Sequence, residues 1–286
     1  METEKAGILI ESLPYIKKHY GKTMVIKYGG KAMASEELKQ SIATDIVLMK
    51  YVGINPIVVH GGGPDITAYM DKLEKKVEFV EGLRVTDKET MEIVKMVLVG
   101  KINKELVSLI NKHGRLAVGI SGEDGMLIMA KKHHIKGEVD LGFVGEVEKI
   151  NSKLIKDLTG ENFIPVVASV GVDGEGNSYN INADDVAGEL AAALKADKVI
   201  FLTDVVGIYK DKDKASTLIS ELTLAECEDM VAAKAISGGM IPKVKGCIKA
   251  VKGGVNRAHI IDGTVKHALL LEVFTDRGVG TMIRAS

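Results

Sequence analysis

The sequence predicts an α/β fold, a three-layer αβα sandwich around an open, mainly parallel central sheet. Short apolar segments rich in Val, Ile and Leu recur along the 286 residues, and most are followed by a stretch with helical periodicity. These apolar segments are nearly continuous rather than alternating, which is typical of parallel strands covered by helices on both faces. Regular strand–helix alternation of this kind favours a three-layer arrangement.

The individual elements follow from these patterns in chain order. Strands are predicted over 23–27, 56–60, 116–120, 164–170, 198–204 and 258–262. Helices are expected around 35–52, 64–75, 87–113, 184–195, 223–234, 241–252 and 264–271. Between 126 and 150 two short strand-like segments have no helix between them, so an antiparallel excursion at the sheet edge is expected there.

The first twenty residues form a separate feature. Leu9, Ile10, Leu13 and Ile16 recur at helical spacing and predict an amphipathic helix, which Pro14 should bend. Its apolar stripe packs either on its own domain or on a partner chain. No long linker interrupts the rest, so we expect one domain over 1–286, with one lobe over about 21–180 and a second over about 181–286.

Composition excludes several classes of protein. Lys and Arg total 38 against 39 Asp and Glu, and aromatic residues make up 4%, so neither a basic surface nor stacking platforms indicate nucleic-acid binding. The two cysteines fit neither a metal motif nor a disulfide framework. The N-terminus lacks a secretory signal, and no apolar run is long enough to span a membrane. We expect a soluble cytoplasmic protein.

Glycine-rich turns indicate an anion site. They occur at 29–30 and 61–63, where predicted strands end, and at 238–239, where a predicted helix starts, so backbone amides and helix N-termini can approach a phosphate. The dinucleotide fingerprint is missing from the 61–66 loop, which argues against an oxidoreductase. Lys27 precedes the first pair and Lys243 follows the last, and two such cations suit a transferring phosphoryl group. A solvated Lys243 is the alternative.

Two further groups of polar residues lie close to predicted strand ends. Asn180 and Asn182 share one face if the segment is extended, and Asp184 or Asp185 is suited to cap the helix that follows. Arg84 is an isolated arginine in a lysine-rich region, and its planar fork suits a carboxylate. A salt bridge from Arg84 to an internal acid is the competing interpretation.

Six motifs together resemble those of the amino-acid kinase family. They are KYGGKAM (27–33), VVHGGGPDI (58–66), EGLRVTD (81–87), NINADDVAGELA (180–191), LTDVVGIY (202–209) and SGGMIPKV (237–244). They cover almost the whole chain in the family's order. The resemblance implies transfer of the ATP γ-phosphate to the γ-carboxylate of N-acetyl-L-glutamate in arginine biosynthesis. ATP is expected as its Mg²⁺ complex, without a tightly bound cofactor or a protein metal site.

The resemblance also implies roles for individual residues. Lys27 and Lys243 are expected to stabilise the transferring phosphoryl group, and Asp184 to hold both lysines. The substrate-binding residues are expected to be Gly62, Gly63, Arg84 and Asn180, with Arg84 on the α-carboxylate and Asn180 on the acetamido group. The nucleotide side is expected to include Gly29, Gly30, Thr203, Asp204, Tyr209, Lys210 and Gly239. A carboxylate is already ionised at neutral pH, so no general base is needed.

Two features resemble an arginine-inhibited branch of the family. They are the N-terminal helix and the run HALLLEVFTDRGVGTMI (267–283). In that branch the helices interlace dimers into a hexamer, a trimer of dimers, and L-arginine binds between the helix and the C-terminal lobe. Glu272 and Gly280 are the expected arginine contacts. Two rival functions remain, a kinase for another small carboxylate such as glutamate, aspartate or a carried aminoadipate, and a non-catalytic nucleotide or arginine sensor.

Overall fold

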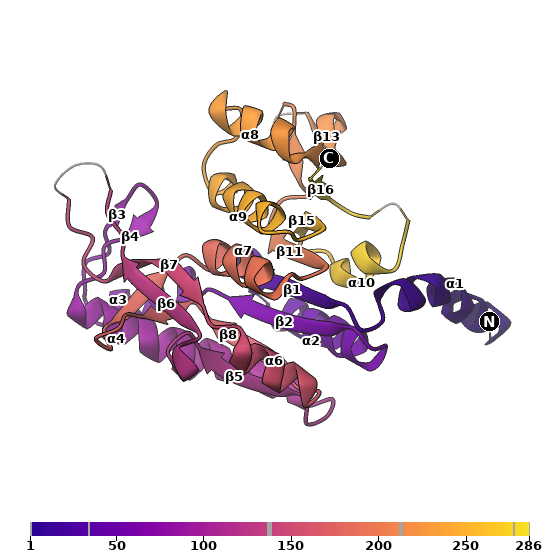
Figure 1. Cartoon of the computed structure of the whole chain (residues 1–286), viewed down its shortest axis with the longest axis horizontal. Coiled ribbons are helices and arrows are strands. Elements are labelled where there is room, and N and C mark those ends of the chain that lie inside the picture. The colour runs from indigo at the N-terminus through magenta and orange to yellow at the C-terminus, as the bar shows by residue number, and fades with distance from the viewer. Residues whose placement is uncertain (1, 34, 136–138, 212–213, 277, 286) are drawn as a thin grey trace.

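The computed structural model describes residues 2–33, 35–135, 139–211, 214–276 and 278–285, and its core is an eight-stranded sheet (Figure 1). The strands in spatial order are β14 (Glu221–Thr223), β16 (Thr281–Arg284), β15 (Arg257–Asp262), β11 (Lys198–Thr203), β1 (Thr23–Tyr28), β2 (Asn55–His60), β8 (Ile164–Ala168) and β5 (Ala117–Ser121). All neighbours are parallel except β15 and β16. The predicted open, mainly parallel sheet is therefore confirmed.

Helices cover both faces of this sheet, which confirms the three-layer arrangement. One face carries α2 (Glu36–Tyr51), α3 (Gly63–Lys72), α4 (Lys88–Lys95), the π-helix η2 (Met96–Ile102), α5 (Asn103–Asn111) and α10 (Ala268–Val273). The other face carries α6 (Lys153–Gly160), α7 (Ala183–Leu194), α8 (Leu224–Ala232) and α9 (Met240–Lys252). Successive residues of β1 alternate between the two apolar layers, Met24 and Ile26 on one side and Val25 on the other.

Strand β1 lies at the centre of the sheet, between β2 and β11. Lys27 lies opposite Val59 of β2 and Phe201 of β11. The carboxyl ends of parallel strands meet at one edge, so Lys27 and the glycine turns after β1 and β2 lie together. All six predicted strands are found close to their expected limits, because Val- and Ile-rich segments buried on both faces have few alternatives.

The expected antiparallel excursion is present and is more elaborate than a hairpin. β6 (Ile128–Lys132) and β7 (Val144–Ile150) pair antiparallel, and β9 (Val170–Val172) with β10 (Ser178–Ile181) closes them into a four-stranded barrel. Residues 136–138 of this segment lie outside the described part of the chain. Two-stranded ladders join β3 (Phe79–Val80) to β4 (Leu83–Arg84) and β12 (Ile208–Tyr209) to β13 (Leu218–Ile219). Short 3₁₀ turns occur at η1 (Gly30–Met33), η3 (Asp124–Met126) and η4 (Ala215–Thr217).

The sequence-based prediction was incomplete at the short and irregular elements, including the two-residue strands β3, β4, β12 and β13. The helix expected over 87–113 is interrupted by the π-helix η2, whose hydrogen-bond pattern leaves no periodicity signal. Helix α6 was not predicted, and neither were the edge strands β14 and β16, which have three and four residues. Segments this short contain too few residues for a helical or strand-like hydrophobic periodicity to be recognised.

The N-terminal helix α1 (Glu2–His19) contains Pro14 and projects from the rest of the fold (Figure 1). Leu9, Ile10 and Leu13 are 71%, 68% and 56% exposed. Of the two alternatives for this stripe, packing on the chain's own domain is therefore wrong for these three residues. Among the described residues, no helix has both the length and the apolarity that crossing a bilayer requires.

Candidate active site

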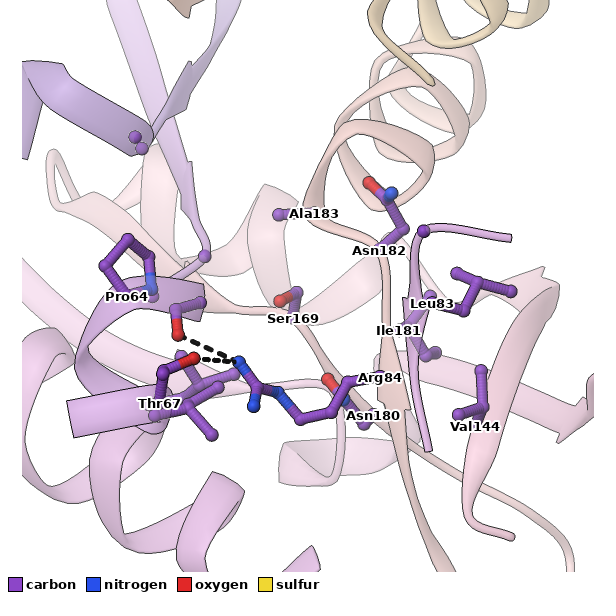
Figure 2. A pocket seen from close by; sticks show the side chains of 18 of the residues that line it. Pro64, Thr67, Leu83, Arg84, Val144, Ser169, Asn180, Ile181, Asn182 and Ala183 are labelled. Atoms are coloured by element: carbon purple, nitrogen blue, oxygen red, sulfur yellow. Dashed lines mark hydrogen bonds between the residues drawn. The ribbon is translucent and has the colours of Figure 1, made fainter. Parts of the chain in front are cut away.

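A cavity of about 470 Å³ opens at the carboxyl edge of β1 and β2. Its lining includes glycines 29, 30 and 61–63 together with Arg84, Ser169 and residues 180–183. Lys27 lies in its wall (Figure 2 shows the pocket from close by). The structure therefore brings together the predicted residues of four separate motifs around one space.

Asp184 binds both predicted lysines. Its Oδ1 lies 3.0 Å from Lys27 Nζ, and its Oδ2 lies 3.3 Å from Lys243 Nζ. Asp184 is only 5% exposed. Two cations on one buried carboxylate leave a surplus positive charge at the cavity, which an anionic ligand would neutralise. The solvated alternative for Lys243 is wrong.

The cap of α7 corrects one expectation. We predicted that Asp184 or Asp185 caps this helix, but the cap is Asn182, whose Oδ1 accepts the Asp184 N–H at 2.8 Å. Because Asn182 satisfies the helix N-terminus, both oxygens of Asp184 are left for the lysines. Asp185 instead forms an ion pair with Lys249 of α9.

A close helix crossing sets the distance between Asp184 and Lys243. Helices α7 and α9 touch through backbone at Gly188 and Gly246, since a Cβ on Gly188 would lie 2.6 Å from the Gly246 carbonyl oxygen. A Cβ on Gly246 would lie 2.8 Å from the Asp184 carbonyl oxygen. Sequence reasoning missed both glycines; Gly in the middle of a helix, where it costs stability, was the available signal.

Arg84 is buried, and its charge has no acidic partner in the part of the chain that the structure describes. One terminal nitrogen donates to the Gly63 carbonyl at 3.0 Å and to Thr67 Oγ1 at 2.8 Å (dashed in Figure 2), and the guanidinium lies over the Phe79 ring. No carboxylate of the described residues lies within 4 Å of Arg84, so the competing interpretation, a salt bridge to an internal acid, is not found. Burial lowers the pKa of Arg84, and the charge of Asp71 opposes this only in part. A ligand carboxylate fits this position.

Asn180 lies beside Arg84 in Figure 2, and Thr86 orients it. Thr86 is fully buried and donates its hydroxyl proton to the Arg84 carbonyl at 2.7 Å. Its oxygen can therefore only accept from Asn180, whose Nδ2 lies 3.3 Å away. This fixes the amide so that its Oδ1 is left for another donor. Thr86 was not predicted, because an isolated threonine carries no sequence signal.

Two of the predicted glycines, Gly30 and Gly62, occupy positions that need a glycine. Gly30 has φ +66° at the start of η1, and a Cβ on Gly29 would lie 3.0 Å from Lys27 Nζ. A Cβ on Gly62 would lie 2.2 Å from Ile102 Cδ1. Gly63 begins α3, so its N–H is one of the helix's free donors at the cavity.

The residues predicted for the nucleotide are divided between two places. Tyr209 and Lys210 line a second depression of about 710 Å³, which also includes residues 234–237. Thr203 ends β11 and is buried, with its hydroxyl 3.3 Å from Asp204. Gly239 caps α9, and its carbonyl accepts from Lys243 Nζ at 3.3 Å, so it lies beside the lysine pair.

Glu272 and Gly280 line a smaller cavity of about 270 Å³ between α1 and the C-terminal segment. Tyr15, Lys18 and His19 face them from α1. Glu272 lies 2.6 Å from His259 Nδ1 and accepts the Val279 N–H at 2.9 Å. Burial raises the pKa of Glu272, but the His259 and Val279 donors outweigh it, so the pKa lies below its usual value.

The described residues hold no group of three or more His, Cys, Asp or Glu side chains arranged to bind a metal ion. The acidic residue at the centre of the site already binds two lysines. A divalent cation that is coordinated by nucleotide phosphates and water is compatible with this arrangement.

The fold and the lysine pair define a phosphotransferase that handles an anionic group. Residues 22–262 match the amino acid kinase family, and the chain belongs to that family. It is similar to the acetylglutamate kinases of Caldicellulosiruptor bescii (58% identical, covering 98% of this chain and 96% of the relative) and Heliobacterium modesticaldum (56% identical, covering 98% of each). The chain is therefore a kinase, and the resemblance read from its motifs is confirmed.

Solved structures show the same fold. An N-acetylglutamate synthase from Neisseria gonorrhoeae, complexed with coenzyme A and N-acetyl-glutamate, superposes with a TM-score of 0.86 at 23% identity, over 98% of this chain and 63% of that one. A carbamate kinase from Giardia lamblia bound to AMP-PNP superposes with a TM-score of 0.71 at 18% identity, over 93% of this chain and 99% of that one. At these identities the likeness is one of fold.

Proposed function

We propose that this kinase transfers the γ-phosphate of ATP to the γ-carboxylate of N-acetyl-L-glutamate and that L-arginine inhibits it. The observation that carries the proposal is the Lys27–Asp184–Lys243 cluster, whose Lys27 lines a cavity that also contains Arg84, a buried cation with no acidic partner among the described residues. A dicarboxylate needs one cation for the carboxylate that binds and others for the carboxylate that reacts. The names of the relatives support the same acceptor.

The charges around the cavity favour one orientation of the acceptor. Arg84 takes the α-carboxylate, and the Oδ1 of Asn180 accepts the N–H of the acetamido group, since its Nδ2 faces Thr86. The γ-carboxylate then reaches the lysine pair, where it attacks the γ-phosphorus while the bond to the β-phosphate oxygen breaks. The products are an acyl phosphate and ADP. No base is required, because the nucleophile is already ionised.

The nucleotide approaches from the C-terminal side. Tyr209 and Lys210 line the second depression and are suited to the nucleoside end, and Thr203 and Asp204 at the end of β11 are assigned to the same ligand. The phosphates reach Gly239 and the backbone N–H groups of Gly29 and Gly30. Mg²⁺ enters bound to the phosphates. Lys27 and Lys243 neutralise the charge that develops on the transferring group, which is the main requirement of phosphoryl transfer.

Steady-state turnover with a panel of acceptors tests the substrate. We expect turnover with N-acetyl-L-glutamate to exceed that with free glutamate, aspartate and N-acetylaminoadipate. The variant Arg84→Met keeps a long side chain without the charge. It should raise the KM for N-acetyl-L-glutamate by about 100-fold, which is the loss of affinity expected when a buried charge-assisted pair is removed. Turnover on free glutamate alone would overturn the choice of acceptor. Binding of ATP without any turnover would instead favour a sensor.

Inhibition by arginine is proposed at the cavity between α1 and the C-terminal segment. Ionised Glu272 suits a guanidinium, and Lys198 and Arg257 in the same wall suit a carboxylate. Gly280 lies where a Cβ would meet the Ile260 carbonyl oxygen at 2.0 Å, so this position in the cavity wall requires a glycine. Because both ends of the chain form this cavity, a ligand in it can bias how the two lobes approach each other.

The exposed stripe on α1 supports assembly through this helix. A projecting helix with 56–71% exposed leucine and isoleucine side chains is suited to bury them against a partner copy, and we propose a hexamer built as a trimer of dimers. Millimolar L-arginine should raise the apparent KM for the acceptor. Removal of residues 1–20 should abolish this effect and leave dimers. A truncated protein that stays hexameric and inhibitable would contradict both roles of α1.

A further inference from the structure

His60 ends β2 directly before the glycine loop 61–63, and it takes no part in the reaction as described above. Its side chain is completely buried. Burial lowers its pKa to about 4, although the Gly61 carbonyl opposes the shift, so the ring is neutral at pH 7. A neutral imidazole has one donor and one acceptor nitrogen, and its surroundings decide which is which.

Asn103 decides the tautomer of His60. Its Nδ2 lies 2.8 Å from the Val166 carbonyl and 3.3 Å from the Ile120 carbonyl, both of which can only accept. The same nitrogen lies 3.1 Å from His60 Nε2, so Nε2 accepts. The proton is then on Nδ1, which donates to the Gly61 carbonyl at 3.0 Å.

This hydrogen bond fixes the peptide between Gly61 and Gly62. The peptide is trans, and in a planar trans peptide the C=O and N–H point in opposite directions. When the Gly61 carbonyl turns inward to His60, the Gly62 N–H turns away from the buried ring. Gly62 lines the cavity together with Lys27, and its N–H has no acceptor among the described residues.

The π-helix supports the same loop from behind. Leu98 and Ile102 of η2 occupy the space that a Cβ on Gly62 would need, at 2.7 and 2.2 Å. Asn103 follows η2 directly and begins α5. The π-helix thus supplies the apolar contact with Gly62, and the residue directly after it supplies the amide that sets the His60 tautomer. π-Helices are rare and frequently occur at functional sites.

We propose that His60 is a positioning residue, which with Asn103 holds the Gly62 N–H toward the oxygens of the reacting carboxylate and phosphoryl group. This inference rests on the proposed function. A preorganised backbone donor stabilises the charge that develops in the transition state and costs no reorganisation at that moment. Loss of the donor's orientation should therefore lower kcat rather than raise KM.

Two variants of equal polarity separate positioning from packing. His60→Asn places an amide N–H close to where Nδ1 lies, and so retains a donor for the Gly61 carbonyl. His60→Gln places its amide near Nε2, so it retains the partner of Asn103 and lacks that donor. We expect His60→Asn to keep kcat within about threefold, and His60→Gln to lower kcat about 100-fold with little change in KM. Both lose ring volume, so their melting temperatures should fall together.

Equal kcat in the two variants would overturn the positioning role. A second measurement needs no substrate and no variant: imidazole ¹⁵N shifts of His60 in the wild-type protein between pH 6 and 8. Protonated Nδ1 is expected, and protonated Nε2 would overturn the inference even if the variants do not fold. Absence of wild-type turnover with N-acetyl-L-glutamate would instead overturn the proposed function, and the tautomer would still be measurable.

Discussion

Two buried aspartates, Asp45 and Asp184, connect distant parts of the chain in different ways. Asp45 of α2 is 0% exposed and lies 2.6 Å from His267, the residue that precedes α10. Asp184 of α7 is 5% exposed and binds lysines from β1 and α9. Each carboxylate thus joins segments more than a hundred residues apart.

The partners of the two carboxylates indicate different roles. Burial raises the pKa of Asp45 to about 6, although His267 and the N–H groups of Leu269 and Leu270 oppose the shift. The groups around Asp45 are thus one histidine and two backbone donors, and the carboxyl group connects α2 to the start of α10. Asp184 carries one negative charge and binds two lysines, so one positive charge is not neutralised, and Lys27 lies in the wall of a cavity. A buried acid with surplus cations indicates an anionic ligand, whereas a buried acid with protein donors alone indicates a structural contact.

The largest effect is expected from removing one cation of Asp184. Lys27→Met should lower kcat about 1000-fold, because charge stabilisation by a cation is a dominant contribution in phosphoryl transfer. MgATP binding should remain within a few-fold. Lys249→Met is the control, since Lys249 is also paired with acids, Asp185 and Glu189. Initial-rate kinetics measure kcat, and calorimetry measures MgATP binding. An unchanged kcat in Lys27→Met would mean that the lysines at Asp184 have no more functional importance than the partners of Asp45.

Neutralising Asp184 should have the next largest effect. In Asp184→Asn the two lysines lose their common partner and repel each other, so we expect kcat to fall about 100-fold. The helix cap should survive, because it belongs to Asn182. Thermal unfolding monitors the fold alongside the kinetics. Full activity in this variant would show that the lysines hold their positions without the carboxylate.

A smaller effect is expected from separating α7 and α9. Gly188→Ala places a Cβ against the Gly246 carbonyl and moves Asp184 away from Lys243, so kcat should fall about 10-fold. Gly160→Ala at the end of α6 is the control, since nothing lies within 4 Å of its added Cβ. Equal kcat in the two variants would mean that the helix crossing does not set the spacing.

The smallest effect on turnover is expected at the other aspartate. Asp45→Asn should leave kcat within about twofold and change the pH dependence of stability instead. The folded-state pKa of about 6 lies above the ordinary value of 3.8, so the folded wild type takes up a proton before the unfolded chain does. Acidification from pH 7 to pH 4 should therefore stabilise the wild type relative to the variant by on the order of 2 kcal/mol. Urea unfolding across this range measures it, and a wild type that gains no stability relative to the variant on acidification would contradict the raised pKa.

The central strands were predictable from sequence, and the irregular elements were not. Strands β1, β2, β8 and β11 are apolar on both faces, and that pattern has one main solution. The π-helix η2, the short edge strands and the closure of the small barrel depend on tertiary contacts between segments far apart in sequence. No local pattern reports such contacts, so propensity and periodicity could not reveal them.

The residues of the site also divide into those that the local sequence reveals and those that only tertiary contacts reveal. The local sequence revealed the charged residues Lys27, Arg84, Asp184 and Lys243, because charges beside glycine turns at strand ends and helix starts are unusual unless a ligand binds there. Thr86, Asn103 and Gly188 were missed, since each acts by orienting a neighbour and is ordinary for its element. The cap was assigned to the wrong residue, because Asn182 and Asp184 have nearly equal preference for that position.

Binding of a phosphoryl-transfer transition-state mimic tests the lysine pair most directly. In the presence of N-acetyl-L-glutamate, aluminium fluoride should increase the affinity of the wild-type protein for MgADP by at least about 100-fold, because a site that complements the transition state binds its analogue more tightly than its substrates. Lys27→Met and Lys243→Met should each lose this gain and still bind MgADP alone. An undiminished gain in either variant would contradict the assignment of Lys27 and Lys243 to the transferring phosphoryl group.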